Sequence, residues 1–147
     1  MTKIGISAFC TANPVRNQRQ KRHSNCGARR YNVKAHLWLL YAAKEQLEKN
    51  EGSFITTASL AGVKPSGSSL PYSVTKAAAI HLSKALAVIC SPSIRVNSVA
   101  PGLLMTEWGM KFPEGKREAA REATKLKRFA TVEVSFPLVS LLLLYLR

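Results

Sequence analysis

A tyrosine and a lysine stand four residues apart in a stretch typical of a helix. Because an α-helix turns once every 3.6 residues, Tyr72 and Lys76 share one face of the helix predicted over residues 71–90. An ammonium group beside a phenol stabilises the phenolate and lowers the pKa of a phenol from about 10. A phenol tuned in this way can exchange a proton with an alcohol or a carbonyl near neutral pH. Pairs of this kind are also common on solvated helix faces, so the pair alone does not identify an active site.

A serine precedes this pair at the end of a predicted strand. Ser59 lies 13 residues before Tyr72 and directly follows residues 53–58, a short segment rich in β-branched side chains. A hydroxyl at a strand end that faces the start of the next helix can hydrogen-bond the same substrate oxygen as the phenol. We therefore interpret Ser59, Tyr72 and Lys76 together as a candidate proton-transfer site.

Three helices are predicted around these residues. Apolar side chains recur every three or four positions over residues 33–49, which predicts a helix that ends at the Asn-Glu-Gly sequence following it. Pro71 opens the helix over residues 71–90, which is apolar on most faces and is expected to be heavily buried. Residues 111–127 alternate glutamates with lysines and arginines at helical spacing, which predicts a charged, exposed helix.

Two strands alternate with these helices. The first is residues 53–58 and the second is residues 94–100, which Pro101 and Gly102 close. An order of helix, strand, helix, strand and helix is typical of an α/β fold with a doubly wound parallel sheet. In such sheets ligands bind at the carboxyl ends of the strands, which here are the segments at Ser59 and at Pro101.

Length and composition bound the possible functions. The chain has 147 residues, enough for one ordinary domain, and a net charge of +14. All eight acidic residues are glutamates, which excludes aspartate-dependent sites such as EF-hand loops, aspartic-protease dyads and Walker-B magnesium sites. Three cysteines, an odd number, argue against a disulfide-built secreted scaffold. The longest apolar run, residues 136–146, is shorter than the roughly 20 residues of a membrane span, so no membrane partner is expected.

Both ends of the chain differ from its middle. Residues 1–31 carry seven basic and no acidic side chains and are interpreted as a basic head, disordered or of foreign origin. Within this head, residues 4–9 alternate like a short strand. Residues 134–147 form an atypical apolar tail, a candidate for a buried helix after Pro137. The folded domain is therefore expected over residues 32–133.

No metal site is expected. The possible ligands in the head, Cys10, His23 and Cys26, match no common zinc spacing. Two further histidines, His36 and His81, fall on predicted helices without a partner in the sequence, which favours surface or packing roles.

The motifs of residues 32–133 together resemble the C-terminal half of the short-chain dehydrogenase/reductase family. The matching segments, in order, are Asn32-Val33, Gly52-Ser53-Phe54-Ile55, Ser59-Leu60-Ala61-Gly62, Tyr72-Ser73-Val74-Thr75-Lys76-Ala77-Ala78, Arg95-Val96-Asn97-Ser98-Val99-Ala100-Pro101-Gly102 and Thr106. The resemblance implies a partial Rossmann-like domain, with a doubly wound parallel sheet in an incomplete three-layer α/β/α arrangement. It also implies an oxidoreductase that moves hydride between nicotinamide and a carbonyl or alcohol substrate.

The resemblance implies catalytic roles for four residues. Tyr72 is similar to the family's catalytic acid and base, and Lys76 to the lysine that tunes it. Ser59 is similar to the residue that orients the substrate oxygen. Asn32 is similar to the helix asparagine that holds a water molecule in the family's proton relay.

The resemblance also implies NAD or NADP as cofactor. Its contacts would come from Tyr72 and Lys76, and from Pro101, Gly102 and Thr106 in the loop after the second strand. In the family, the helices matching residues 32–50 and 71–90 form the subunit interface, so a homo-oligomer is expected.

The sequence departs from the family pattern in several respects, of which the cofactor-binding turn matters most. The glycine-rich turn that approaches the cofactor pyrophosphate, Thr-Gly-x-x-x-Gly-x-Gly, does not occur. We therefore expect a truncated family member, with a catalytically inactive remnant or splice product that keeps the fold and the dimerisation surfaces as the alternative. A basic nucleic-acid-binding protein is a third reading, but no aromatic residues interleave the basic ones in the head, and no nucleic-acid partner is expected. The expected location is cytoplasmic, with a mitochondrial location as alternative because the head is arginine-rich and lacks acidic residues.

Overall fold

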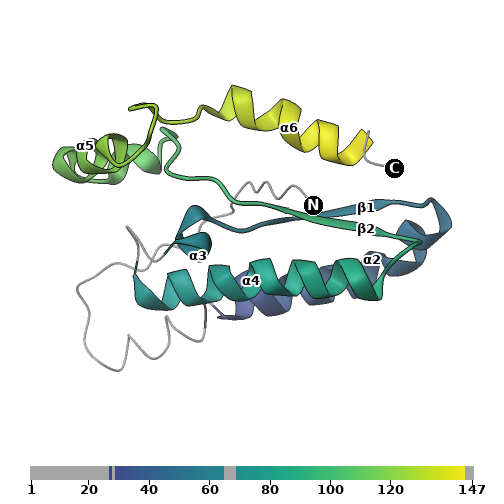
Figure 1. The fold of residues 1–147 in the computed structure, drawn as a ribbon. Coiled ribbons are helices and arrows are strands. Elements are labelled where there is room, and N and C mark those ends of the chain that lie inside the picture. The colour runs from purple at the N-terminus through teal and green to yellow at the C-terminus, as the bar shows by residue number, and fades with distance from the viewer. Residues whose placement is uncertain (1–26, 28, 65–68, 145–147) are drawn as a thin grey trace.

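The fold alternates helices with two strands. The computed structural model describes residues 27, 29–64 and 69–144. Its elements, in chain order, are the π-helix η1 (Arg30–Lys34), α2 (Ala35–Lys49), β1 (Ser53–Thr57), α3 (Leu60–Val63), α4 (Leu70–Ile89), β2 (Arg95–Val99), the 3-10 helix η2 (Gly109–Lys111), α5 (Glu114–Glu122) and α6 (Val132–Leu144) (Figure 1). The basic head up to residue 26, with its predicted strand and its Cys10, His23 and Cys26, lies outside the described residues.

The two strands form a parallel sheet between helical layers. Ser53 pairs with Arg95 and Thr57 with Val99, without a shift in register. Helices α2 and α4 lie on one face of the pair and α6 lies on the other, against β1 (Figure 1). The chain between the strands includes α4, as a parallel connection requires. The predicted α/β class with parallel strands is therefore confirmed.

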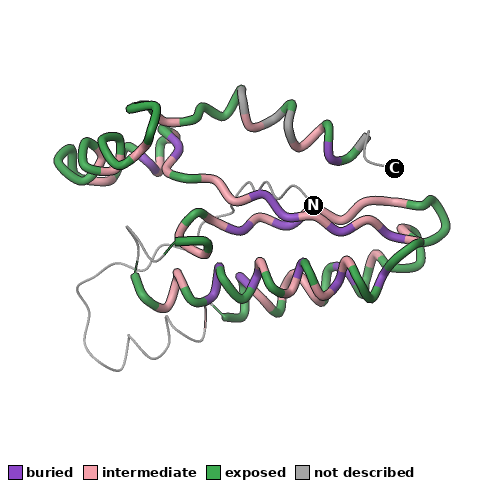
Figure 2. Tube along the Cα trace, in the orientation of Figure 1, coloured by how far each residue is buried: buried purple, intermediate pink, exposed green. Residues whose placement is uncertain are grey.

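The core lies between the sheet and the helix pair. Its buried side chains come from α2, from the end of α4 and from the region of β2: Leu40, Leu86, Cys90, Ile94 and Val96. Figure 2 shows buried positions along both strands and on α4, whereas α5 is almost entirely exposed. The turn before β1 is tight, since Glu51 has φ 47° and the Gly52 amide donates to the Leu47 carbonyl at 2.7 Å. This turn ends α2 where the sequence predicts.

Some predicted elements differ from the observed ones. The loop expected after Ser59 contains the short helix α3. The charged helix is shorter than residues 111–127, because Pro113 precedes it and α5 begins at Glu114. The prediction that the helix over residues 71–90 is buried on most faces is wrong for its outward side, where Val74, Val88 and Ile89 are more than half exposed.

The apolar tail forms the helix α6, which begins before Pro137 rather than after it. Leu142 is fully buried, whereas its neighbours Leu141 and Leu143 are nearly half exposed. The Arg95 guanidinium donates to the carbonyls of Leu142 and Leu143, at 3.2 and 3.1 Å. A cation at these carbonyls satisfies acceptors that the end of the helix leaves unpaired and opposes its negative dipole end. Across the described ranges, no helix combines the length and apolar character that a bilayer span needs.

Candidate functional site

The centre of the candidate site is a buried lysine. Lys76 on α4 is 1% exposed, and its Nζ donates to the backbone carbonyl of Thr57, the last residue of β1, at 2.8 Å. Burial lowers the pKa of Lys76 from 10.5 to about 8. The ammonium lies 5.8 Å from the centroid of the Tyr72 ring. The predicted pair therefore shares one face of α4, and that face meets the carboxyl end of β1.

Ser59 caps the short helix α3, which packs against α4. Its side chain accepts a hydrogen bond from the Ala61 amide at 3.2 Å, as an N-cap residue does. The Ser73 hydroxyl, next to Tyr72, donates to the Ala61 carbonyl. Gly62 lies directly on α4, because a Cβ at this position would be 2.5 Å from the Lys76 carbonyl carbon. Glycine is thus required here by the close approach of two backbones.

Asn32 is buried on η1, where it faces α4 next to the lysine. Its Nδ2 donates to the Thr75 Oγ1 at 3.0 Å, and Thr75 in turn donates to the Tyr72 carbonyl at 2.9 Å. Asn32 therefore contacts the residue that directly precedes Lys76. This bond joins the π-helix η1 to α4 across 43 positions of the sequence.

The loop after β2 reaches the same end of the sheet. The Leu60 amide, next to Ser59, donates to the Pro101 carbonyl at 2.8 Å. Gly102 is exposed, and a Cβ on it would meet only the Leu60 side chain, at 3.7 Å. The Thr106 hydroxyl accepts a bond from the Gly109 amide at 3.3 Å and so stabilises the turn that leads into η2. Pro101 and Gly102 thus adjoin the Ser59 helix, whereas Thr106 lies further along the loop.

A titratable side chain beside this cluster is His36 on α2. Its Nδ1 is buried and has no hydrogen-bond partner among the residues that the structure describes. Burial, and secondly the charge of Lys76, lower the pKa of His36 below 6.5. An unpartnered buried nitrogen is unusual in a folded protein, which makes this histidine a candidate for a role beyond packing.

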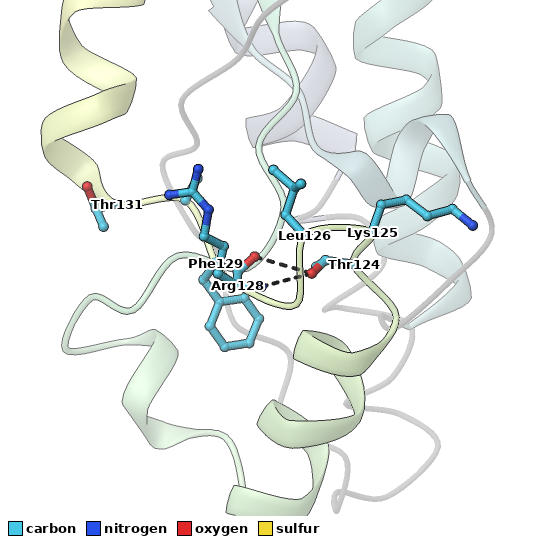
Figure 3. Close-up of a pocket in the computed structure, with 7 residues that line it drawn as sticks. Thr124, Lys125, Leu126, Arg128, Phe129 and Thr131 are labelled. Atoms are coloured by element: carbon cyan, nitrogen blue, oxygen red, sulfur yellow. Dashed lines mark hydrogen bonds between the residues drawn. The ribbon is translucent and has the colours of Figure 1, made fainter.

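An open hollow of about 330 Å³ lies elsewhere, in the turn between α5 and α6 (Figure 3). Its lining residues are Thr124, Lys125, Leu126, Arg128, Phe129, Ala130 and Thr131. The Thr124 hydroxyl accepts from the Arg128 amide at 3.1 Å and so holds the turn closed. None of the predicted site residues lines this hollow, which is therefore separate from the candidate site.

Sequence reasoning found the side chains of the cluster but missed their partners. The Thr57 carbonyl and the Thr75 hydroxyl have no signal in the sequence, because each bond joins segments distant along the chain. The sequence favours a surface or packing role for His36, and its position one helical turn after Asn32 is the signal that places it near the cluster. In the described part of the chain, no three potential metal ligands gather.

Comparisons with known proteins decide the family. A family model described as enoyl-(acyl carrier protein) reductase matches residues 7–143. The chain belongs to the short-chain dehydrogenase/reductase family. The match begins before Asn32 and ends after Glu133, so it is wider than the motifs alone indicate.

Two curated short-chain dehydrogenase/reductase relatives align with about two thirds of the chain. Short-chain dehydrogenase/reductase SDRA of Arabidopsis thaliana is 42% identical over 103 residues, which are 68% of this chain and 40% of that protein. Tropinone reductase-like 3 of Erythroxylum coca is 39% identical over 104 residues, 69% of this chain and 40% of that protein. The chain thus spans well under half the length of these relatives.

The solved structure of NAD+-bound xylitol dehydrogenase resembles this member of the short-chain dehydrogenase/reductase family in fold. The TM-score is 0.75 at 22% identity, and the overlap covers 82% of this chain and 54% of that one. The predicted Rossmann-like fold is therefore confirmed as a partial one.

Proposed function

We propose that this chain carries the proton-transfer site of an NAD(P)-dependent oxidoreductase that acts on a carbonyl or alcohol substrate. The observation that carries the proposal is the lysine that is buried beside Tyr72 and held by the carboxyl end of β1. A fully buried ammonium costs free energy in a structural role, and such perturbed groups cluster at functional sites.

The proposed roles follow the geometry. Tyr72 donates its phenol proton to the substrate oxygen during reduction and takes it back during oxidation. Lys76, positively charged below its pKa of about 8, stabilises the phenolate left behind. Ser59 orients the substrate oxygen from the start of α3. Asn32 fixes Thr75 and, through it, the turn of α4 that bears the lysine.

NAD or NADP fits this site at its nicotinamide end. Lys76 has three N–H donors, and the bond to Thr57 uses one of them, which leaves donors for ribose hydroxyls. Pro101 is partly buried and Gly102 is exposed at the carboxyl end of β2, and Thr106 follows in the same loop. When bound, the nicotinamide exchanges hydride with the substrate carbon. Residues that would hold the pyrophosphate are not recognised in the described ranges.

Replacing the phenol tests the proposal. In the Tyr72→Phe variant, we expect turnover of a carbonyl or alcohol substrate to fall by about 10²-fold or more, because the phenol proton is lost. Cofactor affinity should stay within about twofold of the unchanged chain. Tyr41→Phe is the matched control, since Tyr41 is 64% exposed on α2. Near-normal turnover by Tyr72→Phe would remove this residue from proton transfer.

The second candidate function is that of a non-catalytic remnant that retains its subunit surfaces. Exposed apolar side chains on α2 and α4 support a homo-oligomer built through these helices, including Trp38, Leu39, Val74, Val88 and Ile89. Calorimetric titration separates the two candidates. Binding of NAD or NADP in the micromolar range favours the enzyme, whereas no detectable heat with a stable oligomer favours the remnant. The proposed compartment is the cytoplasm, where the buried free thiol of Cys90 would stay reduced.

A further inference from the structure

An arginine on α5 carries a buried donor that the proposed proton transfer does not use. The Nε of Arg117 is buried and has no hydrogen-bond partner among the residues that the structure describes. Its Nη1 donates to the Sδ of Met110 on η2 at 3.3 Å. A guanidinium presents five N–H donors, whereas a thioether is a weak acceptor. The partner therefore matches this cation poorly, which is unusual for a group with a buried donor.

The charges around Arg117 leave it open to an anion. Residues 111–128 hold seven basic and three acidic side chains. Two of these glutamates are paired with other cations, Glu118 with Arg121 and Glu122 with Lys127. The third, Glu114, is exposed and forms no ion pair with a described residue. An anion that approaches Arg117 thus meets a net positive segment.

Arg117 is connected to the candidate site through η2 and the loop after β2. The Met110 amide donates to the Thr106 carbonyl at 2.9 Å. The same loop begins at Pro101, whose carbonyl accepts the amide that follows Ser59 in sequence. Figure 1 shows α5 at the end of the sheet to which both strands lead, which is also the end where α3 lies. A substrate held at Ser59 can therefore extend along this loop toward Arg117.

Exposed apolar side chains lie along this path. They are Leu60, which directly follows Ser59, and the two methionines Met105 and Met110. A Cβ on Gly102 would meet the Leu60 Cδ2 at 3.7 Å, so Leu60 lies against the loop. An apolar path with a polar group at each end fits a ligand whose apolar chain has polar groups at both ends.

We propose that Arg117 binds a carboxylate of the substrate, which displaces the Met110 thioether from the guanidinium. The inference rests on the proposed function and names the class of substrate for the same site: a carbonyl or alcohol compound with a carboxylate at the end of an apolar chain. A carboxylate accepts paired, charge-assisted hydrogen bonds from a guanidinium, which a thioether does not. Met110 gives way easily because its side chain is exposed and unbranched.

The Met110 methyl group reports binding without requiring turnover. The full chain has three methionines, so ¹³C-methyl labelling of methionine gives three signals, and Met110→Leu assigns the relevant one. The probes are 6-oxoheptanoate and 2-heptanone, two methyl ketones of equal chain length, of which only the first ends in a carboxylate. We expect 6-oxoheptanoate to shift the Met110 signal and to bind about tenfold more tightly than 2-heptanone, because it alone engages the guanidinium.

Substitutions on α5 assign this preference to one side chain. Arg117→Gln should abolish it, so that both probes bind with the affinity of 2-heptanone. Arg117→Lys keeps the charge without the planar fork and should retain a smaller preference, which guards against a loss of folding in the glutamine variant. Arg121→Gln, four positions further along α5, is the matched control and should leave the preference unchanged.

The outcomes separate this inference from the proposed function. Equal affinity for the two ketones in the unchanged chain would overturn it, and so would a preference that survives Arg117→Gln. Inorganic pyrophosphate is the third probe. If it shifts the Met110 signal and binds more tightly than 6-oxoheptanoate, the anion site belongs to the cofactor and the assignment to the substrate is wrong. If Tyr72→Phe retains normal turnover, the proposed function fails, but the binding measurement still reports on Arg117.

Discussion

The two sides of α4 each mix polar and apolar side chains, unlike those of an ordinary surface helix. The inward side buries Thr75, Lys76 and Ser83, and the polar group of each has a hydrogen-bond partner. The outward side exposes apolar side chains, among them Val88 at 75% and Ile89 at 74%. An amphipathic helix usually separates the two classes, whereas α4 also buries Ala79 and Leu86 beside its polar groups.

Helix α4 therefore does not owe its position to the burial of an apolar stripe alone. Buried polar groups are tolerated where they are satisfied, and they favour one arrangement over near alternatives. The inward side therefore orients the site residues, whereas the outward side exposes apolar side chains, which is typical of an interaction surface.

The largest effect is expected at the buried lysine. Below pH 8, Lys76 is protonated in both the folded and the unfolded chain. Between pH 8 and 10.5, the unfolded chain alone holds this proton, so the free energy of unfolding rises with pH, by about 3 kcal/mol at most. Urea denaturation measures this free energy for the unchanged chain and for Lys76→Met across this window. It should rise with pH in the unchanged chain relative to the variant, which lacks the titrating group. Parallel curves would show that the lysine is not buried as described.

A methyl group between α3 and α4 should have the next largest effect. Gly62→Ala places a Cβ 2.5 Å from the Lys76 carbonyl carbon, so α3 must move away from α4. Overpacking of this kind costs about 1–3 kcal/mol. Gly115→Ala on α5 is the matched control, because a Cβ there meets nothing within 4 Å. Thermal unfolding of both variants measures the difference, and equal midpoints would contradict the close approach.

Loss of one buried hydroxyl should cost somewhat less. Ser83 shares a hydrogen bond of 2.6 Å with Thr56 on β1, and both residues are buried. Ser83→Ala leaves the Thr56 hydroxyl without this partner, which costs about 1–2 kcal/mol in urea denaturation. The double variant Thr56→Val, Ser83→Ala should lose less than the sum of the single variants. Strict additivity would mean that the two hydroxyls do not interact.

On the outward side, polar substitutions should hardly alter stability but should alter assembly. Val88→Ser with Ile89→Ser changes the free energy of unfolding of one chain by only about 0.5 kcal/mol, because both side chains are exposed. Light scattering across a range of concentrations should nevertheless report a smaller mass than for the unchanged chain. Leu126→Ser, exposed in the turn after α5, is the control. An unchanged mass in the double variant would remove this face from any subunit contact.

The sequence predicts this fold well where a local pattern determines the element. Both strands and the two long helices lie within a few residues of their predicted bounds, because their periodicity and their Pro and Gly boundaries are local signals. The pairing of Tyr72 with Lys76 follows from helical spacing alone. The hydrogen-bond partners of the site residues cannot be predicted in this way. Thr57 contacts Lys76, and Thr75 contacts Asn32, only through the tertiary fold. Hydrophobicity alone also overestimates the burial of α4, because apolar Val74, Val88 and Ile89 are exposed.

The parallel register of β1 and β2 has a consequence for how the chain reaches its fold. Ser53 and Arg95 are partners although 42 positions separate them, so pairing of the strands requires closure of a long loop. Helical turns in α4 form on a submicrosecond timescale, whereas such distant pairing makes folding slow. During that interval the edges of both strands are open to other chains. Refolding yield should therefore fall as protein concentration rises, even where the folded chain is stable.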